Sequence, residues 1–138
     1  MKVVAYFDAA VKQPGNPGHA GAGVVLYDAE GNEVCAFSAY LGLRTVNEAE
    51  YSAAILAVEE ALARNATSLE LYGDSKVVIY QTTGIYDCHA ENLKPYREAL
   101  LEALGELPAW RATHVRRNFN GRADYLSRLE LDDFLSRA

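Results

Sequence analysis

The first strand-like segment restricts the possible folds of this chain more than any other feature. Residues 2–8 read KVVAYFD, an almost unbroken apolar run. Such a run is typical of a strand that is buried on both faces of its sheet. The remainder of the chain must therefore supply helices for both faces. At 138 residues, the chain is long enough for one domain of this kind and too short for two, so residues 1–138 are assigned to a single domain.

The order of the remaining elements predicts a mixed sheet. Residues 9–21 are rich in Gly, Pro and Asn and predict a long turn. Residues 22–41 predict a hairpin, with turn residues in the sequence DAEGN. The remaining segments are predicted as helix 45–64, strand 68–74, helix 75–84, helix 89–107, strand 109–115 and a final helix from residue 120. An antiparallel block followed by strand–helix–strand crossovers predicts an α/β fold with a mixed five-stranded sheet and helices on both faces.

Charge and hydropathy narrow the classes of function. The formal net charge of −6 argues against a strongly basic nucleic-acid binder. Between Arg111 and Arg128, however, there are five arginines and a single acid, which is consistent with either a solvated surface or a local phosphate-facing patch. No apolar run approaches the length of a membrane span, and the N-terminus lacks a signal-peptide pattern, so we expect a cytoplasmic protein with no membrane association. Cys35 and Cys88 are expected to be reduced.

Two acidic residues follow strands that are expected to be buried. Asp8 is predicted to end the first strand, and Asp74 to end the strand at 68–74. If these strands are parallel neighbours, their carboxylates meet at one edge of the sheet and repel each other unless a cation neutralises them. Oxygen ligands without nearby His or Cys suit Mg²⁺ or Mn²⁺. Asp74 also suits the N-cap of the next helix, so a purely structural role stays open.

The helix predicted at residues 45–64 contains two glutamates that differ in position. At ~100° per residue, Glu50 falls among alanines on the buried side, whereas Glu48 falls on the polar side. Glu48 is explained as a first-turn acid, but a buried Glu50 is costly unless it is paired or bound to a cation. Asp124, near the start of the last helix, is a further candidate acid, although a first-turn helix charge also explains it.

Together these residues resemble type 1 ribonuclease H over nearly the whole chain, most closely its short bacterial and archaeal branch, which lacks a large basic protrusion. The stretches that carry the resemblance are YFDAA, PGNPGHAGAGVVLYD, TVNEAEYSAAILAVEEAL, LYGDSKVVIYQTTG, ENLKPYREAL and HVRRNFNGRAD. The string GHAGAG within them leads into a strand and lacks the order of a dinucleotide-binding motif.

The resemblance implies hydrolysis of the RNA strand of an RNA–DNA hybrid, giving 5′-phosphate and 3′-hydroxyl ends. It maps the four carboxylates of the family onto Asp8, Glu50, Asp74 and Asp124. These would hold two Mg²⁺ ions, with Mn²⁺ as a possible substitute, around one phosphodiester. The hybrid is the implied partner, and no obligatory protein partner is evident.

The resemblance also implies substrate contacts. Asn16 and Asn47 match positions that sense the 2′-hydroxyl across the minor groove, and Gly15 and Gly18 would allow the backbone to approach the nucleic acid. Lys76 is a further predicted contact, standing where the family usually has glutamine.

Other positions depart from the family pattern. Ala9 replaces a usual glycine, and Val46 stands where a second asparagine is common. His114 is assigned to the preceding strand with a structural role. Because several departures touch substrate contacts, the alternative is a related nucleic-acid-binding protein with weak or lost cleavage.

Overall fold

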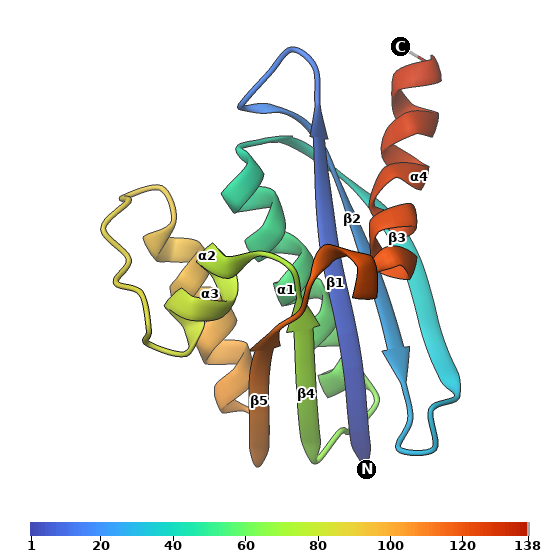
Figure 1. Ribbon diagram of the computed structural model, residues 1–138, viewed down its shortest axis with the longest axis vertical. Helices are drawn as coiled ribbons and strands as arrows, with labels where there is room; N and C mark the ends of the chain where they lie inside the picture. Colours follow the sequence, from blue (N-terminus) through green and yellow to red (C-terminus); the bar gives the residue numbers. More distant parts are fainter. Residues whose placement is uncertain (138) are drawn as a thin grey trace.

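A five-stranded mixed sheet forms the centre of the computed structural model, which describes residues 1–137 (Figure 1). The strands are β1 (Lys2–Lys12), β2 (Gly18–Tyr27), β3 (Glu33–Arg44), β4 (Ser68–Gly73) and β5 (Ala109–His114). Their order in the sheet is β3-β2-β1-β4-β5. β1 pairs antiparallel with β2 and parallel with β4, and β4 pairs parallel with β5. The predicted mixed sheet is confirmed, with β1 at its centre.

Each of the four helices lies within a predicted helical segment, although the helix predicted at residues 89–107 begins only at Lys94. They are α1 (Val46–Ala63), α2 (Lys76–Thr82), α3 (Lys94–Gly105) and α4 (Gly121–Arg137), with a short 3₁₀ helix, η1 (Arg117–Phe119), before α4. The α1–α3 group lies behind the sheet in Figure 1, and α4 lies in front of it. No helix within residues 1–137 is long and apolar enough to cross a membrane.

The length of β1 corrects one prediction. The strand does not end at Asp8 but continues to Lys12, and the predicted turn at residues 9–21 shrinks to the five residues between β1 and β2. The reason is the antiparallel ladder with β2, which extends to the pair Lys12↔His19. The parallel ladder with β4, in contrast, stops at Phe7↔Gly73. Asp8 therefore lies within β1, one residue beyond the point at which the β1–β4 ladder ends.

The N-terminus of α1 is held by a capping box. The Thr45 hydroxyl accepts a hydrogen bond from the Glu48 N–H at 3.1 Å, and the Glu48 carboxylate accepts one from the Thr45 N–H at 2.8 Å. This reciprocal pair satisfies two backbone donors at the helix end and confirms the structural explanation of Glu48. The buried side of α1 is formed largely by alanines, including Ala53, Ala54 and Ala57. Small side chains bring the helix, and with it Glu50, close to the sheet.

On the opposite face, α4 packs directly on β2. A Cβ atom at Gly21 would collide with the carbonyl oxygen of Ser127, and one at Gly23 with the carbonyl oxygen of Ala123. The GHAGAG string therefore permits close helix–sheet packing. α4 covers only one end of this face in Figure 1, so the N-terminal half of β1 has no helix over it.

Candidate active site

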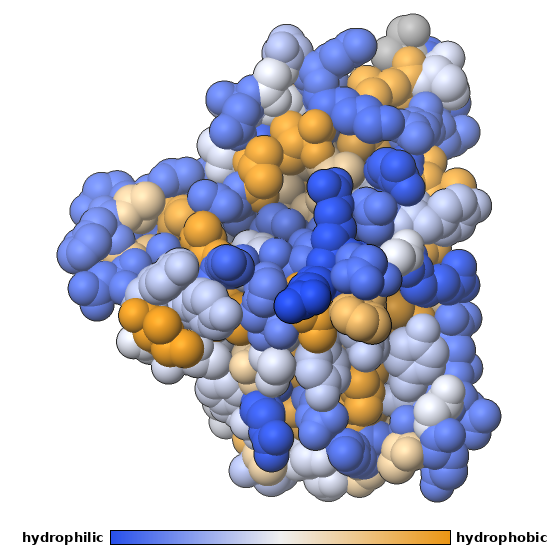
Figure 2. Space-filling model, in the orientation of Figure 1, coloured by the Kyte–Doolittle hydropathy of each residue, from blue (hydrophilic) through white to orange (hydrophobic). Residues whose placement is uncertain are grey.

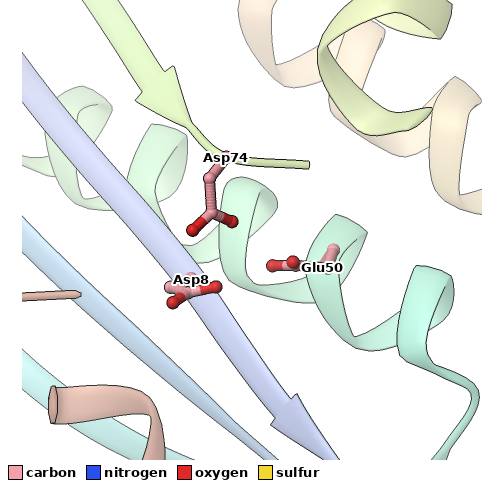
Figure 3. A group of neighbouring side chains, drawn as sticks. All are labelled: Asp8, Glu50 and Asp74. Atoms are coloured by element: carbon pink, nitrogen blue, oxygen red, sulfur yellow. The ribbon is translucent and has the colours of Figure 1, made fainter. Parts of the chain in front are cut away.

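Three acidic side chains converge where the ladder between β1 and β4 ends (Figure 3). Asp8, Glu50 and Asp74 each offer a carboxylate oxygen, and these atoms all lie within 4.8 Å of one another. Asp8 comes from β1 where the β4 ladder ends, Asp74 directly follows β4, and Glu50 comes from the first turns of α1. The predicted meeting of Asp8 and Asp74 through parallel neighbouring strands is confirmed, and Glu50 joins them as its helical position predicted.

The alternative role of Asp74 as a helix cap is not what the structure shows. Ser75 is the N-cap of α2, and its hydroxyl accepts a hydrogen bond from the Val78 N–H at 3.2 Å. Because the neighbouring serine meets the needs of the helix end, the Asp74 carboxylate is left to face Asp8 and Glu50, as Figure 3 shows.

Burial and mutual repulsion perturb two of the acids. The exposed fractions of Asp8 and Glu50 are only 4% and 8%. Burial, reinforced by the negative charge of Asp74, raises the pKa of Asp8 from 3.8 to about 7. Burial also raises the pKa of Glu50 well above its ordinary value, with Asp8 and then Asp74 adding repulsion. Both shifts have the causes that disfavour an ionised carboxyl group: loss of water and proximity of like charge.

The cluster has the chemistry of a divalent cation site. Glu50 Oε1 is buried and accepts no hydrogen bond from the described residues. A buried carboxylate oxygen without a donor is costly, and a cation would remove that cost as well as the repulsion within the cluster. The donor set contains only oxygen, which is typical of Mg²⁺ and Mn²⁺ sites. The residues present therefore fit the predicted metal.

Asp124, the fourth predicted acid, lies at the margin of this cluster. It belongs to the first turn of α4, and its negative charge contributes to the raised pKa of Asp8. Its carboxylate Oδ2 lies 3.5 Å from an Arg128 guanidinium nitrogen, and it is not among the three residues that share the 4.8 Å grouping. The structure thus brings three of the four predicted ligands together, and the role of Asp124 stays a prediction.

The acids open into a pocket of about 440 Å³. Its other walls are formed by Ala9, Val46, His114, Arg116 and Arg117. The two arginines place positive charge beside the acids, which favours the phosphate-facing interpretation of the arginine-rich segment.

His114 was expected to have only a structural role, and the pocket shows that this expectation was incomplete. The residue does end β5, and its ring lies 5.8 Å from the ring of Tyr80. It also forms part of the pocket wall. The Val115 N–H donates to the Gly73 carbonyl at 3.0 Å, so this end of β5 lies beside the residue that precedes Asp74. The sequence contained a signal for this position of His114. The histidine lies at the end of a predicted strand, and Asp74 ends the predicted strand before it, so parallel pairing of the two strands would bring them together.

Asn120 is a second residue that sequence reasoning missed. It is 1% exposed, and its side-chain amide donates a hydrogen bond to the Phe7 carbonyl at 2.9 Å. The backbone carbonyl of Asn120 accepts a hydrogen bond from the Asp124 N–H at 3.0 Å. Asn120 therefore ties the start of α4 to β1 directly beside Asp8, which positions Asp124 relative to the acid cluster.

Replacing Asn120 by alanine is expected to lower the free energy of unfolding by about 1–3 kcal/mol, because the buried Phe7 carbonyl loses its donor. Chemical denaturation measures this loss. Asn118→Ala, at an exposed neighbouring position of η1, is the matched control and should leave stability within about 0.5 kcal/mol of the parent. Equal effects of the two substitutions would contradict the positioning role.

The predicted substrate contacts are distributed around the same end of the molecule. Asn16 Oδ1 accepts from the Val46 N–H at 2.9 Å, which links the β1–β2 loop to the start of α1. Asn47 lies in the first turn of α1, Lys76 is exposed at the start of α2, and Gly15 is exposed in the loop. Gly18 is buried, and a Cβ atom there would strike carbonyl oxygens of the loop itself. Glycine at position 18 therefore serves the loop conformation, and the substrate contacts stay predictions.

Comparisons with known proteins agree with this geometry. Residues 6–129 match the model of the reverse transcriptase-like family. Ribonuclease HI of Halobacterium salinarum is 41% identical over 132 residues, which cover 96% of this chain and 65% of that protein. The chain thus spans slightly less than two thirds of the length of this relative.

Solved structures show the same similarity in three dimensions. The crystal structure of RNase H1 from Halobacterium salinarum matches with a TM-score of 0.92 and 40% identity, covering 96% of this chain and 99% of that one. The structure of LC11-RNase H1 in complex with an RNA/DNA hybrid matches with a TM-score of 0.90 and 32% identity, again covering 96% and 99% of the two chains. With its fold, its acid cluster and these relatives in agreement, the chain belongs to the type 1 ribonuclease H family.

Proposed function

We propose that this protein is an endonuclease that hydrolyses the RNA strand of RNA–DNA hybrids and leaves 5′-phosphate and 3′-hydroxyl ends. The observation that carries the proposal is the convergence of Asp8, Glu50 and Asp74 within 4.8 Å. The related Ribonuclease HI of Halobacterium salinarum and the hybrid complex of LC11-RNase H1 support the substrate class.

The acid cluster of Asp8, Glu50 and Asp74, together with Asp124, would hold two Mg²⁺ ions, or Mn²⁺ in their place. When bound, such ions activate a water molecule and stabilise the negative charge that develops on the scissile phosphate and on the leaving 3′-oxygen. The chain's own contribution is to fix the carboxylates in a largely buried position before substrate arrives. Since β1, β4 and α1 are all parts of the packed core, the acids need little rearrangement to act.

Arg116 and Arg117 would contact the substrate's phosphates from the other wall of the pocket. Their charge offsets the net negative charge of the protein at the one place where a polyanion must approach. Asn16 and Asn47 would contact the minor groove, where the 2′-hydroxyl distinguishes RNA from DNA. A cytoplasmic location and independence from any protein partner also stay predictions.

The proposal is tested by incubating the purified protein and Mg²⁺ or Mn²⁺ with an end-labelled hybrid. Single-stranded RNA, double-stranded RNA and duplex DNA are the control substrates. We expect cleavage of the hybrid alone, in its RNA strand, and end analysis should find a 5′-phosphate on each downstream product. A gel shift of the hybrid without cleavage at any metal concentration would instead support the alternative, a nucleic-acid-binding protein that has lost turnover.

His114 is placed to carry a proton during the reaction. An imidazole on the pocket wall can donate a proton to a leaving oxygen or accept one from water. We expect His114→Ala to lower kcat by about 10²-fold with little change in KM, because the phosphate contacts remain. Steady-state kinetics on the hybrid measures both constants. His19→Ala serves as the control, since His19 bonds to Tyr40 in the β2–β3 region and does not line the pocket; a kcat unchanged in His114→Ala would remove His114 from the mechanism.

A further inference from the structure

The uncovered part of the sheet carries an aromatic surface that the proposed reaction does not use. We call it the aromatic platform, and it consists of Tyr6 on β1, Tyr27 on β2, Tyr72 on β4 and Phe119 on η1. The rings of Tyr6 and Tyr72 are stacked, with centroids 5.1 Å apart, and Tyr27 meets Tyr6 edge-on at 5.9 Å. Figure 2, which views this side of the molecule, shows apolar patches breaking the polar surface over the middle of the sheet.

A cavity of about 420 Å³ lies on the platform. Tyr6, Tyr27 and Phe119 line it, together with Val4, Val25 and Arg122. Phe119 is 67% exposed. The exposed ring is therefore accessible to a ligand that enters the cavity.

The platform is continuous with the active site. Arg117 belongs to the wall of the acid pocket, whereas Phe119 and Asn120 line the cavity on the platform. The short helix η1 begins at Arg117 and ends at Phe119. A ligand that extends from the acid pocket along η1 therefore reaches the platform. The hydrogen bond from the Asn120 side chain to the Phe7 carbonyl holds the end of η1 against β1.

The charges around the platform favour a nucleic acid as the occupant. Arg116 and Arg117 line the acid pocket, and Arg122 lines the platform cavity with Phe119. Three acids, Asp28, Glu33 and Glu70, are nearby, and each already has a partner. The Tyr72 hydroxyl donates a hydrogen bond to Glu70 at 3.1 Å, and Lys2 pairs with Glu70 at 3.7 Å. The Asp28 carboxylate accepts hydrogen bonds from the backbone of Glu30 and Asn32, and Glu33 pairs with Arg122 at 3.2 Å. Because Arg122 is already paired, the positive charge offered to a ligand comes from Arg116 and Arg117.

We propose that the platform binds the single-stranded segment of a nucleic acid that flanks the hybrid in the active site. Bases of the flank stack on Phe119 and the tyrosines, and Arg116 and Arg117 contact its phosphates. Aromatic rings on a sheet beside cationic side chains are suited to unpaired bases, because only an unpaired base can present its whole face to a ring. The link to the active site rests on the proposed function, whereas binding of a single strand to the platform does not require cleavage.

The first experiment measures binding of a fluorescein-labelled single-stranded DNA by anisotropy. Single-stranded DNA is not a substrate of the proposed reaction, so this experiment is independent of cleavage. We expect the double variant Tyr27→Ser/Phe119→Ser to bind it about tenfold more weakly than the parent, because each stacked base contributes appreciably to affinity. The single variant Phe119→Ser should show part of the loss and, being at an exposed position, should not affect folding. Tyr86→Ser, another exposed tyrosine in the loop after α2, is the control.

The second experiment compares blunt hybrids with hybrids that carry a single-stranded DNA overhang at the 5′ or the 3′ end. The parent should show a KM several-fold lower for one overhang than for the blunt hybrid, and the double variant should lose this difference while cleaving the blunt hybrid normally. Equal binding of single-stranded DNA by parent and double variant would overturn the platform proposal, even if blunt hybrids are cleaved. Failure to cleave any hybrid, with the single-strand binding intact, would count only against the proposed function. A platform that instead mediates self-association would show a concentration-dependent dimer that the variant abolishes, without an overhang effect, which also overturns the proposal.

Discussion

Asp8→Asn is expected to abolish hybrid cleavage, with a loss of at least about 10³-fold in kcat/KM. Asp8 is the central member of the acid cluster, and a neutral amide there removes one negative charge from the site that would hold the cations. Bound metal ions typically supply several kcal/mol of transition-state stabilisation, and each 1.4 kcal/mol corresponds to about a tenfold change in rate. Initial rates on the labelled hybrid, measured across a range of Mg²⁺ concentrations, test this expectation.

The change preserves side-chain volume, so the variant should remain folded, which circular dichroism and thermal unfolding can verify. Asp132→Asn provides the matched control: Asp132 lies on α4, is paired with Lys12 at the surface and is outside the acid pocket. It should retain nearly the parent's rate. Substantial cleavage by folded Asp8→Asn would show that the cations are held elsewhere and would contradict the assignment of the active site.

The second large effect is on stability, and its direction follows from the raised pKa values. In the unfolded chain Asp8 ionises near pH 3.8, whereas in the folded, metal-free protein it ionises near pH 7. Within this window Asp8 binds more protons in the folded state than in the unfolded state, so the contribution of Asp8 to the stability of the metal-free protein falls as the pH rises from about 4 to about 7 and then levels off. The raised pKa of Glu50 acts in the same direction. Thermal unfolding in the presence of a chelator should show this fall.

Mg²⁺ should reverse the loss, and Glu50 provides the decisive variant. A ligand that binds only the folded state raises its stability, and the rise in Tm on adding Mg²⁺ should be larger at pH 8 than at pH 5, where Asp8 is largely protonated. Glu50→Gln should raise the Tm of the metal-free protein at pH 8 by ~5 °C or more, because it removes an acid whose ionisation is opposed by burial and by the charges of Asp8 and Asp74. It should also diminish the response to Mg²⁺.

Glu59→Gln, at an exposed position of the same helix, controls for removing a negative charge from α1. It should change neither the metal-free Tm nor the Mg²⁺ response by more than about 1–2 °C. A Glu50→Gln protein that is less stable than the parent without metal would mean that Glu50 is stabilised by a partner in the metal-free fold, contrary to its orphaned Oε1 atom.

Local sequence patterns determined much of this protein. The order of strands and helices, the helix from residue 46 and the burial of Glu50 follow from periodicity and turn chemistry, which act over a few residues. The same holds for the separation of Glu48 from Glu50. One is a capping residue bonded to Thr45, and the other faces a buried cluster, and their different angular positions on one helix were sufficient to distinguish them.

Only the tertiary structure decided which of these elements complete the site. The true end of β1 depends on how far β2 remains paired with it, and the location of Asp8 beside Asp74 depends on where β4 stops. His114 reaches the pocket because β5 runs parallel to β4. Asn120 reaches Phe7 across 113 positions of sequence. The physical reason is common to all of them: helix and strand periodicity is a local property of the chain, whereas a site at a sheet edge is assembled by hydrogen bonds and packing between segments that are remote in sequence.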